Sequence, residues 1–148
     1  LSSWMHFMNA EVAGVGTAGA TTEVLAGMAD SMEKVSGFAG SPAMSSTAVD
    51  NYTVAFTSAW TNASNAEKGN MWAKQFWITL FGNGTDAYNA YRRTGLPSDV
   101  QPNIEPNPGA FPVSMWYPNN YTARNSNASQ KSDLTGKVFW NTQSPNLK

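Results

Sequence analysis

The sequence predicts a mainly α-helical chain, in which residues 1–96 are helical and residues 97–148 are irregular. Three observations support this division. Before residue 97, apolar residues recur at intervals of three and four, which is the spacing of one helix face. Ser, Thr or Asn precedes several of these runs and Gly follows them, as is usual at helix ends. After residue 96 this periodicity is lost, and seven of the eight prolines lie there.

Three helices are expected first, over residues 3–13, 21–34 and 47–60. A glycine-containing loop separates the first two, and a loop of Gly, Pro and Ser over residues 37–46 precedes the third. In the third helix, Tyr52, Phe56 and Trp60 follow one another at four-residue steps and therefore share a face. Such an apolar face is expected to pack against another helix.

The fourth helix, expected over residues 66–81, is rich in aromatic residues. Ser64 or Asn65 can cap its start, and Glu67 lies in the first turn, where a carboxylate suits the positive end of the helix dipole. Its apolar residues form two stripes, the first with Trp72, Phe76, Thr79 and Leu80 and the second with Ala73, Trp77 and Phe81. A helix that is apolar on two faces is expected to lie between neighbours.

A fifth helix should follow the Gly-Asn-Gly turn of residues 82–84, with Thr85 as its cap. Asp86 lies in its first turn, and Tyr88 and Tyr91 share one face. Arg92 and Arg93 lie at the negative C-terminal end of the helix dipole, and Gly95 and Pro97 are expected to end the helix. The fourth and fifth helices would thus form an αα-hairpin. We expect the rings to be core, and the arginines to cap the helix or stack on rings rather than bind an anion.

Residues 97–148 are expected to wrap over the helices. Their many Asn and Ser residues and scarce apolar periodicity are typical of disorder in a free segment. Several aromatic residues would nevertheless be costly to leave in water, namely Phe111, Trp116, Tyr117, Phe139 and Trp140. We expect these side chains to hold the segment on the helices.

Composition excludes several functional classes. The net charge is −1 and charged residues make up 13% of the 148-residue chain, which gives no basic surface for nucleic acid and no polybasic membrane anchor. No apolar run approaches the roughly 20 residues that cross a bilayer. The absence of Cys removes thiolate metal sites, and no calcium-binding loop is present, so no metal or cofactor is expected.

Catalysis is not expected either. His6 is the only histidine, so a Cys–His pair cannot form and a Ser–His–Asp triad could use only this residue. Residues 14–19 have the G-x-G-x-x-G spacing of a phosphate-binding loop, but they follow a helix rather than a strand. An enzyme would need two of the ten carboxylates to be brought together by folding, as in glycoside hydrolases. We therefore assign no catalytic, metal-binding or cofactor-binding residue.

A ligand-binding site is better supplied with suitable residues. Trp and Tyr rings can stack on the apolar faces of sugars, while Asn side chains hydrogen-bond their hydroxyls. The candidate residues are Trp116, Tyr117 and Tyr121, which lie among Asn119, Asn120 and Asn125. The alternative is that the three rings only hold the irregular segment in place.

The block QFWITLFGNGTDAYNAYRRTG, residues 75–95, resembles the C-terminal signature of the SusD/RagB-like lipoproteins, which bind nutrients at the outer surface of Bacteroidetes. Weaker similarities occur in order along the chain, at residues 7–11, 28–34, 111–118, 125–131 and 138–140. Two residues depart from the family pattern. Val113 stands where the family usually has Arg, and Asn141 where it often has Asp, so an ion pair made elsewhere in the family is not expected here.

This resemblance implies tetratricopeptide-like helical hairpins followed by an irregular wrap rich in Pro and Asn. It also implies that the chain is the C-terminal part of a longer protein, in which the N-terminal half of the family domain and a lipid anchor lie outside residues 1–148. The expected location is the outer membrane at the cell surface.

The implied function is non-enzymatic capture of a glycan and its delivery to a SusC-like TonB-dependent outer-membrane transporter. The resemblance carries over no individual binding residue. The alternative function is a tetratricopeptide-like scaffold that binds a peptide or a protein.

Overall fold

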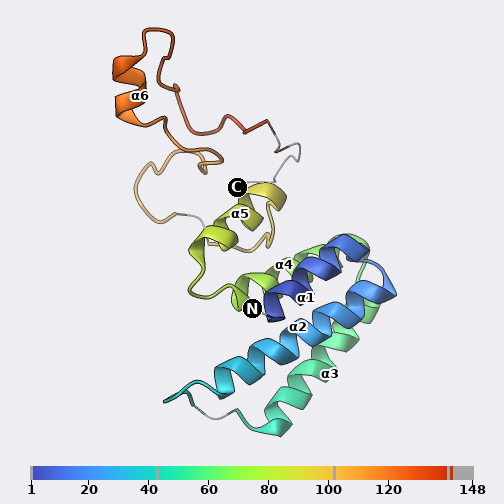
Figure 1. Cartoon of the computed structure of the whole chain (residues 1–148). Helices are drawn as coiled ribbons and strands as arrows, with labels where there is room; N and C mark the ends of the chain where they lie inside the picture. The colour runs from blue at the N-terminus through green and yellow to red at the C-terminus, as the bar shows by residue number, and fades with distance from the viewer. Residues whose placement is uncertain (1, 43, 102, 140, 142–148) are drawn as a thin grey trace. The chain divides into compact units, whose positions relative to one another are not determined.

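The computed structural model describes residues 2–42, 44–101, 103–139 and 141, which form six α-helices and no strand (Figure 1). The helices are α1 (Ser2–Ala13), α2 (Ala18–Ser36), α3 (Ser46–Asn62), α4 (Asn65–Thr79), α5 (Gly84–Thr94) and α6 (Asn119–Arg124). The mainly α fold class is therefore confirmed. The short helix α6 lies in the segment for which we expected no regular structure.

The chain divides into two compact units, Leu1–Ala87 and Tyr88–Lys148. This boundary falls inside α5, so α4 and most of α5 belong to different units. The packing of α4 against α5 as a hairpin therefore stays a prediction. The same is true of the division at residue 96 and of the wrapping of residues 97–148 over the helices. Trp140, which we expected to take part in that wrapping, lies outside the described residues.

Side chains at the helix starts explain why several helices begin where they do. Ser64 caps α4 by accepting a hydrogen bond from the Glu67 N–H, and the Glu67 carboxylate accepts in return from the Ser64 N–H. The prediction that Thr85 caps the start of α5 is wrong. Asn83 takes this role, because its side-chain oxygen accepts from the Asp86 N–H at 3.3 Å and its amide donates to the Asp86 carboxylate at 2.6 Å.

The core of the first unit lies where α1, α2 and α4 meet. Phe7 of α1 stacks on Phe76 of α4 with ring centroids 5.6 Å apart, and Trp72 adds a third ring at 5.7 Å from Phe76. The Trp72 indole donates to the Phe7 carbonyl at 2.9 Å, and the Trp4 indole donates to the Thr79 carbonyl at 3.0 Å. The rings of α4 therefore join it to α1 both by packing and by hydrogen bonds.

Only one of the two expected apolar stripes of α4 is buried. Trp72, Phe76, Thr79 and Leu80 of the first stripe are each less than 10% exposed. In the second stripe, Ala73 is buried, but Trp77 is 37% exposed and Phe81 is 95% exposed. The expectation of burial on two faces is therefore wrong for the second stripe. One reason is that α4 ends at Thr79, so Phe81 lies in the following turn and not on the helix face.

In the second unit, residues 111–114 are held against α5. The Tyr88 hydroxyl donates to the Pro112 carbonyl at 2.6 Å, and Phe111 meets Tyr91 edge-to-face with ring centroids 5.0 Å apart. Arg92 lies over the Tyr88 ring at 5.4 Å and donates to the Val113 carbonyl at 3.3 Å. The expected stacking of an arginine on a ring is thus confirmed for Arg92.

The two residues that depart from the family pattern lie close to Arg92. Val113 is only 3% exposed, and Asn141 is 9% exposed and donates to the Arg92 carbonyl at 3.5 Å. The side-chain oxygen of Asn141 is buried and has no hydrogen-bond partner among the described residues. The positive charge of Arg92 thus faces a tyrosine ring and a backbone carbonyl.

The other aromatic side chains of this segment are more exposed than expected. Trp116 is 50%, Tyr117 43% and Phe139 91% exposed. Among these residues, burial in the described structure therefore supports only Phe111 as a residue that holds the irregular segment in place.

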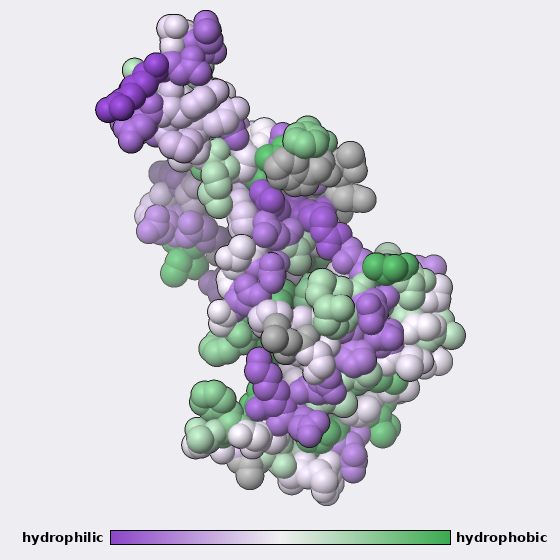
Figure 2. Space-filling model, viewed as in Figure 1, coloured by the Kyte–Doolittle hydropathy of each residue, from purple (hydrophilic) through white to green (hydrophobic). Residues whose placement is uncertain are grey.

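Around α6, the visible surface is mostly hydrophilic, whereas apolar residues show at several separate places over the helices of the first unit (Figure 2).

Candidate functional site

The candidate site is built around the start of α6. Pro118 precedes the helix, and its carbonyl accepts hydrogen bonds from the N–H groups of Tyr121 and Thr122 at 2.9 and 3.3 Å. This first turn places Tyr121 next to Tyr117, with ring centroids 5.8 Å apart and ring planes at 60°. The two tyrosines expected from the sequence as ligand-binding residues are therefore brought together.

Gln130 holds a second segment of the chain against Tyr117. Its side-chain oxygen accepts from the Tyr117 N–H at 3.1 Å, and its side-chain amide donates to the Tyr117 carbonyl at 2.9 Å. Gln130 thus pairs with both the N–H and the C=O of Tyr117, as the backbone of a neighbouring β-strand would. Lys131 follows, with its ammonium group 4.9 Å from the Tyr117 ring centroid.

A turn after α6 supplies the polar residues of the site. The Asn125 side-chain oxygen accepts from the Asn127 N–H at 3.0 Å, and the Asn125 carbonyl accepts from the Ala128 N–H at 3.0 Å. These two bonds form the turn that carries Asn127, Ala128 and Ser129 back toward the tyrosines. Asn125, one of the asparagines near the candidate rings in the sequence, thus uses its side chain to shape this turn.

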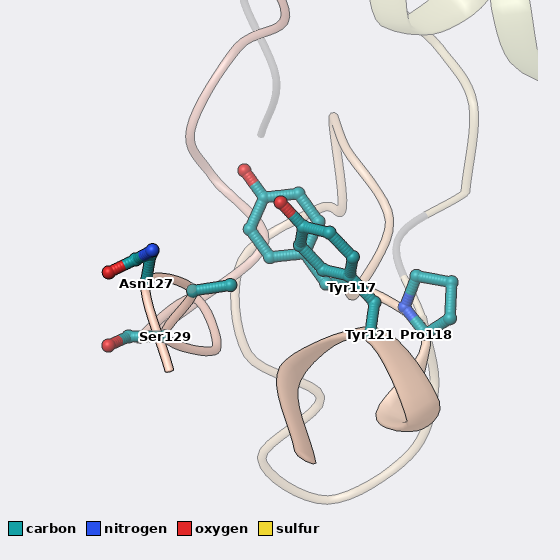
Figure 3. A pocket seen from close by; sticks show the side chains of 6 residues that line it. Tyr117, Pro118, Tyr121, Asn127 and Ser129 are labelled. Atoms are coloured by element: carbon teal, nitrogen blue, oxygen red, sulfur yellow. The ribbon is translucent and has the colours of Figure 1, made fainter. Parts of the chain in front are cut away.

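Between the two segments lies an open hollow of about 550 Å³ (Figure 3). Its walls are formed by Tyr117, Pro118, Tyr121, Asn127, Ala128 and Ser129. Figure 3 shows the two tyrosine rings side by side, with Asn127 and Ser129 on the segment beside them. The rings are about half exposed, at 43% for Tyr117 and 50% for Tyr121. The hollow thus combines two half-exposed rings with neutral amide and hydroxyl groups, and the Lys131 ammonium lies over one of these rings.

The third expected residue, Trp116, does not line this hollow, although it is 50% exposed. The sequence reasoning also missed Asn127 and Ser129. They lie six and eight positions after Tyr121 along the chain, and the turn at Asn125 together with the contact of Gln130 with Tyr117 brings their segment back. The Asn-Ser-Asn-Ala-Ser composition of residues 125–129 is typical of a turn, and it was the one available signal.

Polar clusters elsewhere in the described chain suit structural roles better. His6 on α1 lies between two carboxylates of α2, with Nδ1 at 2.6 Å from Glu23 and Nε2 at 3.7 Å from Asp30. Within residues 2–42, 44–101, 103–139 and 141, no group of three His, Asp or Glu side chains could hold a metal ion. None of the described helices is long and apolar enough to span a bilayer.

Comparison with known proteins identifies one family. The SusD-like family described as "starch-binding associating with outer membrane" matches residues 3–118, which is more than half of the chain. The match includes residues 75–95, Tyr117 and Pro118, and it ends before Tyr121 and the turn that follows. No curated protein and no solved structure matches the chain.

Proposed function

The chain belongs to the SusD-like family, and on this premise we propose that it captures a glycan at the hollow beside Tyr117 and Tyr121. The resemblance inferred from the sequence is thereby confirmed at the level of the family. The description of the family as starch-binding supports a glycan as the ligand. The observation that carries the proposal is the pairing of two half-exposed tyrosine rings in one hollow.

The chemistry of the hollow suits a neutral sugar chain. A tyrosine ring offers a flat apolar face to the C–H side of a sugar, and its hydroxyl adds a hydrogen-bonding group. Asn127 supplies two donors and an acceptor, and Ser129 supplies one donor and an acceptor. The volume of about 550 Å³ lies within the range of roughly 300–1,000 Å³ that is typical of small-ligand sites.

Binding without catalysis is the proposed mode of action. A glycoside hydrolase needs an acid and a second carboxylate on either side of the scissile bond. The six residues that line the hollow include no Asp or Glu. The family description likewise names binding and no reaction.

We further propose that the captured glycan passes to a SusC-like TonB-dependent transporter, at the outer membrane of a bacterium of the Bacteroidetes. The association of the family with the outer membrane supports this location. The lipid anchor and the N-terminal half of the family domain would be supplied by sequence outside these 148 residues. The exposed apolar side chains of Trp77 and Phe81 offer a surface that the N-terminal half could cover.

Affinity electrophoresis in gels with and without soluble starch tests the binding function. We expect starch to retard the wild-type chain and to retard the Y121A variant much less, because one of the two rings is removed. W116A is the matched control, since Trp116 is equally exposed but does not line the hollow. If Y121A and the wild type are retarded equally while W116A is not retarded, the site is misplaced.

Purification of the intact protein from its native membrane tests the proposed partner. Co-purification with a large β-barrel transporter would support delivery to a SusC-like protein. An intact protein that binds peptides in competition with glycans would instead favour the alternative, a tetratricopeptide-like scaffold for peptides or proteins.

A further inference from the structure

A second cavity, unlike the glycan hollow, lies within the first unit between α2, α3 and α4. Its volume is about 290 Å³. Met28 and Met32 of α2, Met44 before α3, Val49 of α3 and Ile78 of α4 form most of its apolar wall. No charged side chain lines it among the described residues. A glycan placed here would lose hydration without finding enough polar partners, so this cavity calls for a different ligand.

Four polar side chains interrupt the apolar wall, namely Ser31, Tyr52, Gln75 and Thr79, and two of them form a pair. The Gln75 side-chain amide donates to the Tyr52 hydroxyl at 2.6 Å. Gln75 is only 9% exposed, whereas Tyr52 is 43% exposed, so the pair runs from a buried to an accessible position. Within the described part of the chain, the Tyr52 hydroxyl proton and the Gln75 side-chain oxygen have no further hydrogen bond. A ligand that enters the cavity therefore meets one donor and one acceptor from this pair, beside the hydroxyls of Ser31 and Thr79.

The helices that form the cavity are held in place from two sides. The bond between Gln75 and Tyr52 joins α4 to α3. The Trp60 indole donates to the Thr21 hydroxyl at 2.9 Å and joins α3 to α2. These two bonds limit how far α3 must move when a ligand binds, which lowers the entropic cost of binding.

Size and wall chemistry together define the ligand. An apolar cavity of about 150 Å³ holds a benzene molecule, so this open cavity of about 290 Å³ has room for one substituted ring, and its mainly apolar wall does not suit an oligosaccharide. Three methionine thioethers favour an aromatic ring, because sulfur makes favourable contacts with ring edges. We propose that this cavity is a binding site for a single neutral phenolic ring, with its hydroxyl on Tyr52 and Gln75.

Methyl NMR of the whole chain labelled with ¹³C at the methionine methyl groups tests this site, with p-cresol as the probe. The chain has seven Met residues, and three of them line the cavity. We expect saturable shifts of the Met28, Met32 and Met44 signals, with a Kd on the order of 1 mM. The signals of Met5 and Met115, which do not line the cavity, should stay in place and serve as internal controls.

Two comparisons make the test specific. V49F should fill the cavity and abolish the shifts, while V54F, on an exposed part of the same helix, should leave them unchanged. Toluene, which lacks the hydroxyl, should bind at least about fivefold more weakly than p-cresol, because the hydrogen bonds to Tyr52 and Gln75 are both lost. The proposal is overturned if no saturable shift occurs, if all seven signals move alike, or if V49F binds as V54F does.

The ring could belong to a free compound or to a tyrosine side chain of a peptide. Titration with N-acetyl-tyrosinamide separates these sources, because its peptide groups add bulk on both sides of the ring. Tighter binding than p-cresol would assign the site to a peptide-borne ring, and weaker binding would assign it to a free phenol. The glycan proposal is unaffected by either result, because its residues lie in the other unit.

Discussion

Replacing Gly27 by Ala is expected to destabilise the first unit, because α1 and α2 meet here with no side chain on the α2 residue. A Cβ added at Gly27 would lie 2.8 Å from Phe7 Cε2 and 3.1 Å from His6 Cβ. Phe7 is fully buried and stacks on Phe76, so its ring has no free space into which it could move. The structure therefore predicts overpacking in the core.

Two effects oppose each other in this substitution. Ala is favoured over Gly inside a helix by about 1 kcal/mol, whereas overpacking a core typically costs about 1–3 kcal/mol. Gly19 provides a matched control on α2, because a Cβ there would meet only Ala13 and Thr17, at 3.8 and 3.9 Å. The preference of the helix for Ala largely cancels between the two variants. We therefore expect G27A to be less stable than G19A by about 1–3 kcal/mol.

Urea unfolding followed by far-ultraviolet circular dichroism measures this difference. A loss of 1 kcal/mol corresponds to a fall in Tm of about 4–8 °C for a domain of 60–100 residues, so thermal melts give a second reading. The m-values of both variants should equal that of the wild type. If G27A and G19A are equally stable, α1 and α2 do not approach each other closely at Gly27, and the described core is wrong there.

Three further substitutions test the first unit in the same urea titration. S64A should lower the free energy of unfolding by about 1 kcal/mol, because the cap of α4 is lost; an unchanged value would contradict the capping box. Hydrogen bonds from the hydroxyl and the N–H of Ser64 lower the pKa of Glu67 in the folded chain. The stability that the Glu67 carboxylate contributes is therefore fully present above the ordinary pKa of a glutamate, and it is lost as the pH falls through the lowered pKa of Glu67. E67Q should accordingly lose less stability than the wild type on acidification, and equal loss would count against this bond. W72F should cost about 1–3 kcal/mol, because the indole hydrogen bond to the Phe7 carbonyl is lost and the smaller ring fills the buried site less completely, whereas W116F at a half-exposed site should cost less than about 0.5 kcal/mol. Equal costs for these two variants would refute the buried hydrogen bond.

The first five helices could be predicted from the sequence because their signals are local. Helix α1 begins at Ser2 and α4 at Asn65, each one residue before the expected start. The cap of α5 was predicted wrongly because Asn83 lies between two glycines and resembles a turn residue, although its side chain also reaches the Asp86 N–H. Helix α6 has 6 residues, which is fewer than the two turns needed for periodicity to show.

Burial was less predictable where it depends on distant contacts. The sequence presents Gln75 as a polar residue of α4, yet it is only 9% exposed, because it is paired with Tyr52, 23 positions away. Phe81 shows the reverse, since an apolar residue expected in the core is 95% exposed in the turn after α4. In both cases, burial depends on where the residue lies relative to the other helices. The local sequence pattern carries no information on that position.

The candidate site shows the same contrast. Tyr117 and Tyr121 are four positions apart, so a single turn suffices to bring their rings together. Asn127 and Ser129 join them because Gln130 bonds to both backbone groups of Tyr117 across 13 positions. A bond between residues this far apart produces no periodic pattern in the sequence, so Asn127 and Ser129 could be found as members of the site only in the structure.

The most direct test of the central claim is a crystal structure of the chain with maltoheptaose. The proposed function predicts a sugar ring in van der Waals contact, at about 4 Å, with the ring of Tyr117 or Tyr121. It also predicts sugar hydroxyls within hydrogen-bond distance of Asn127 or Ser129. A glycan bound at another surface, with the hollow beside α6 empty, would contradict the proposed site while leaving the family assignment intact.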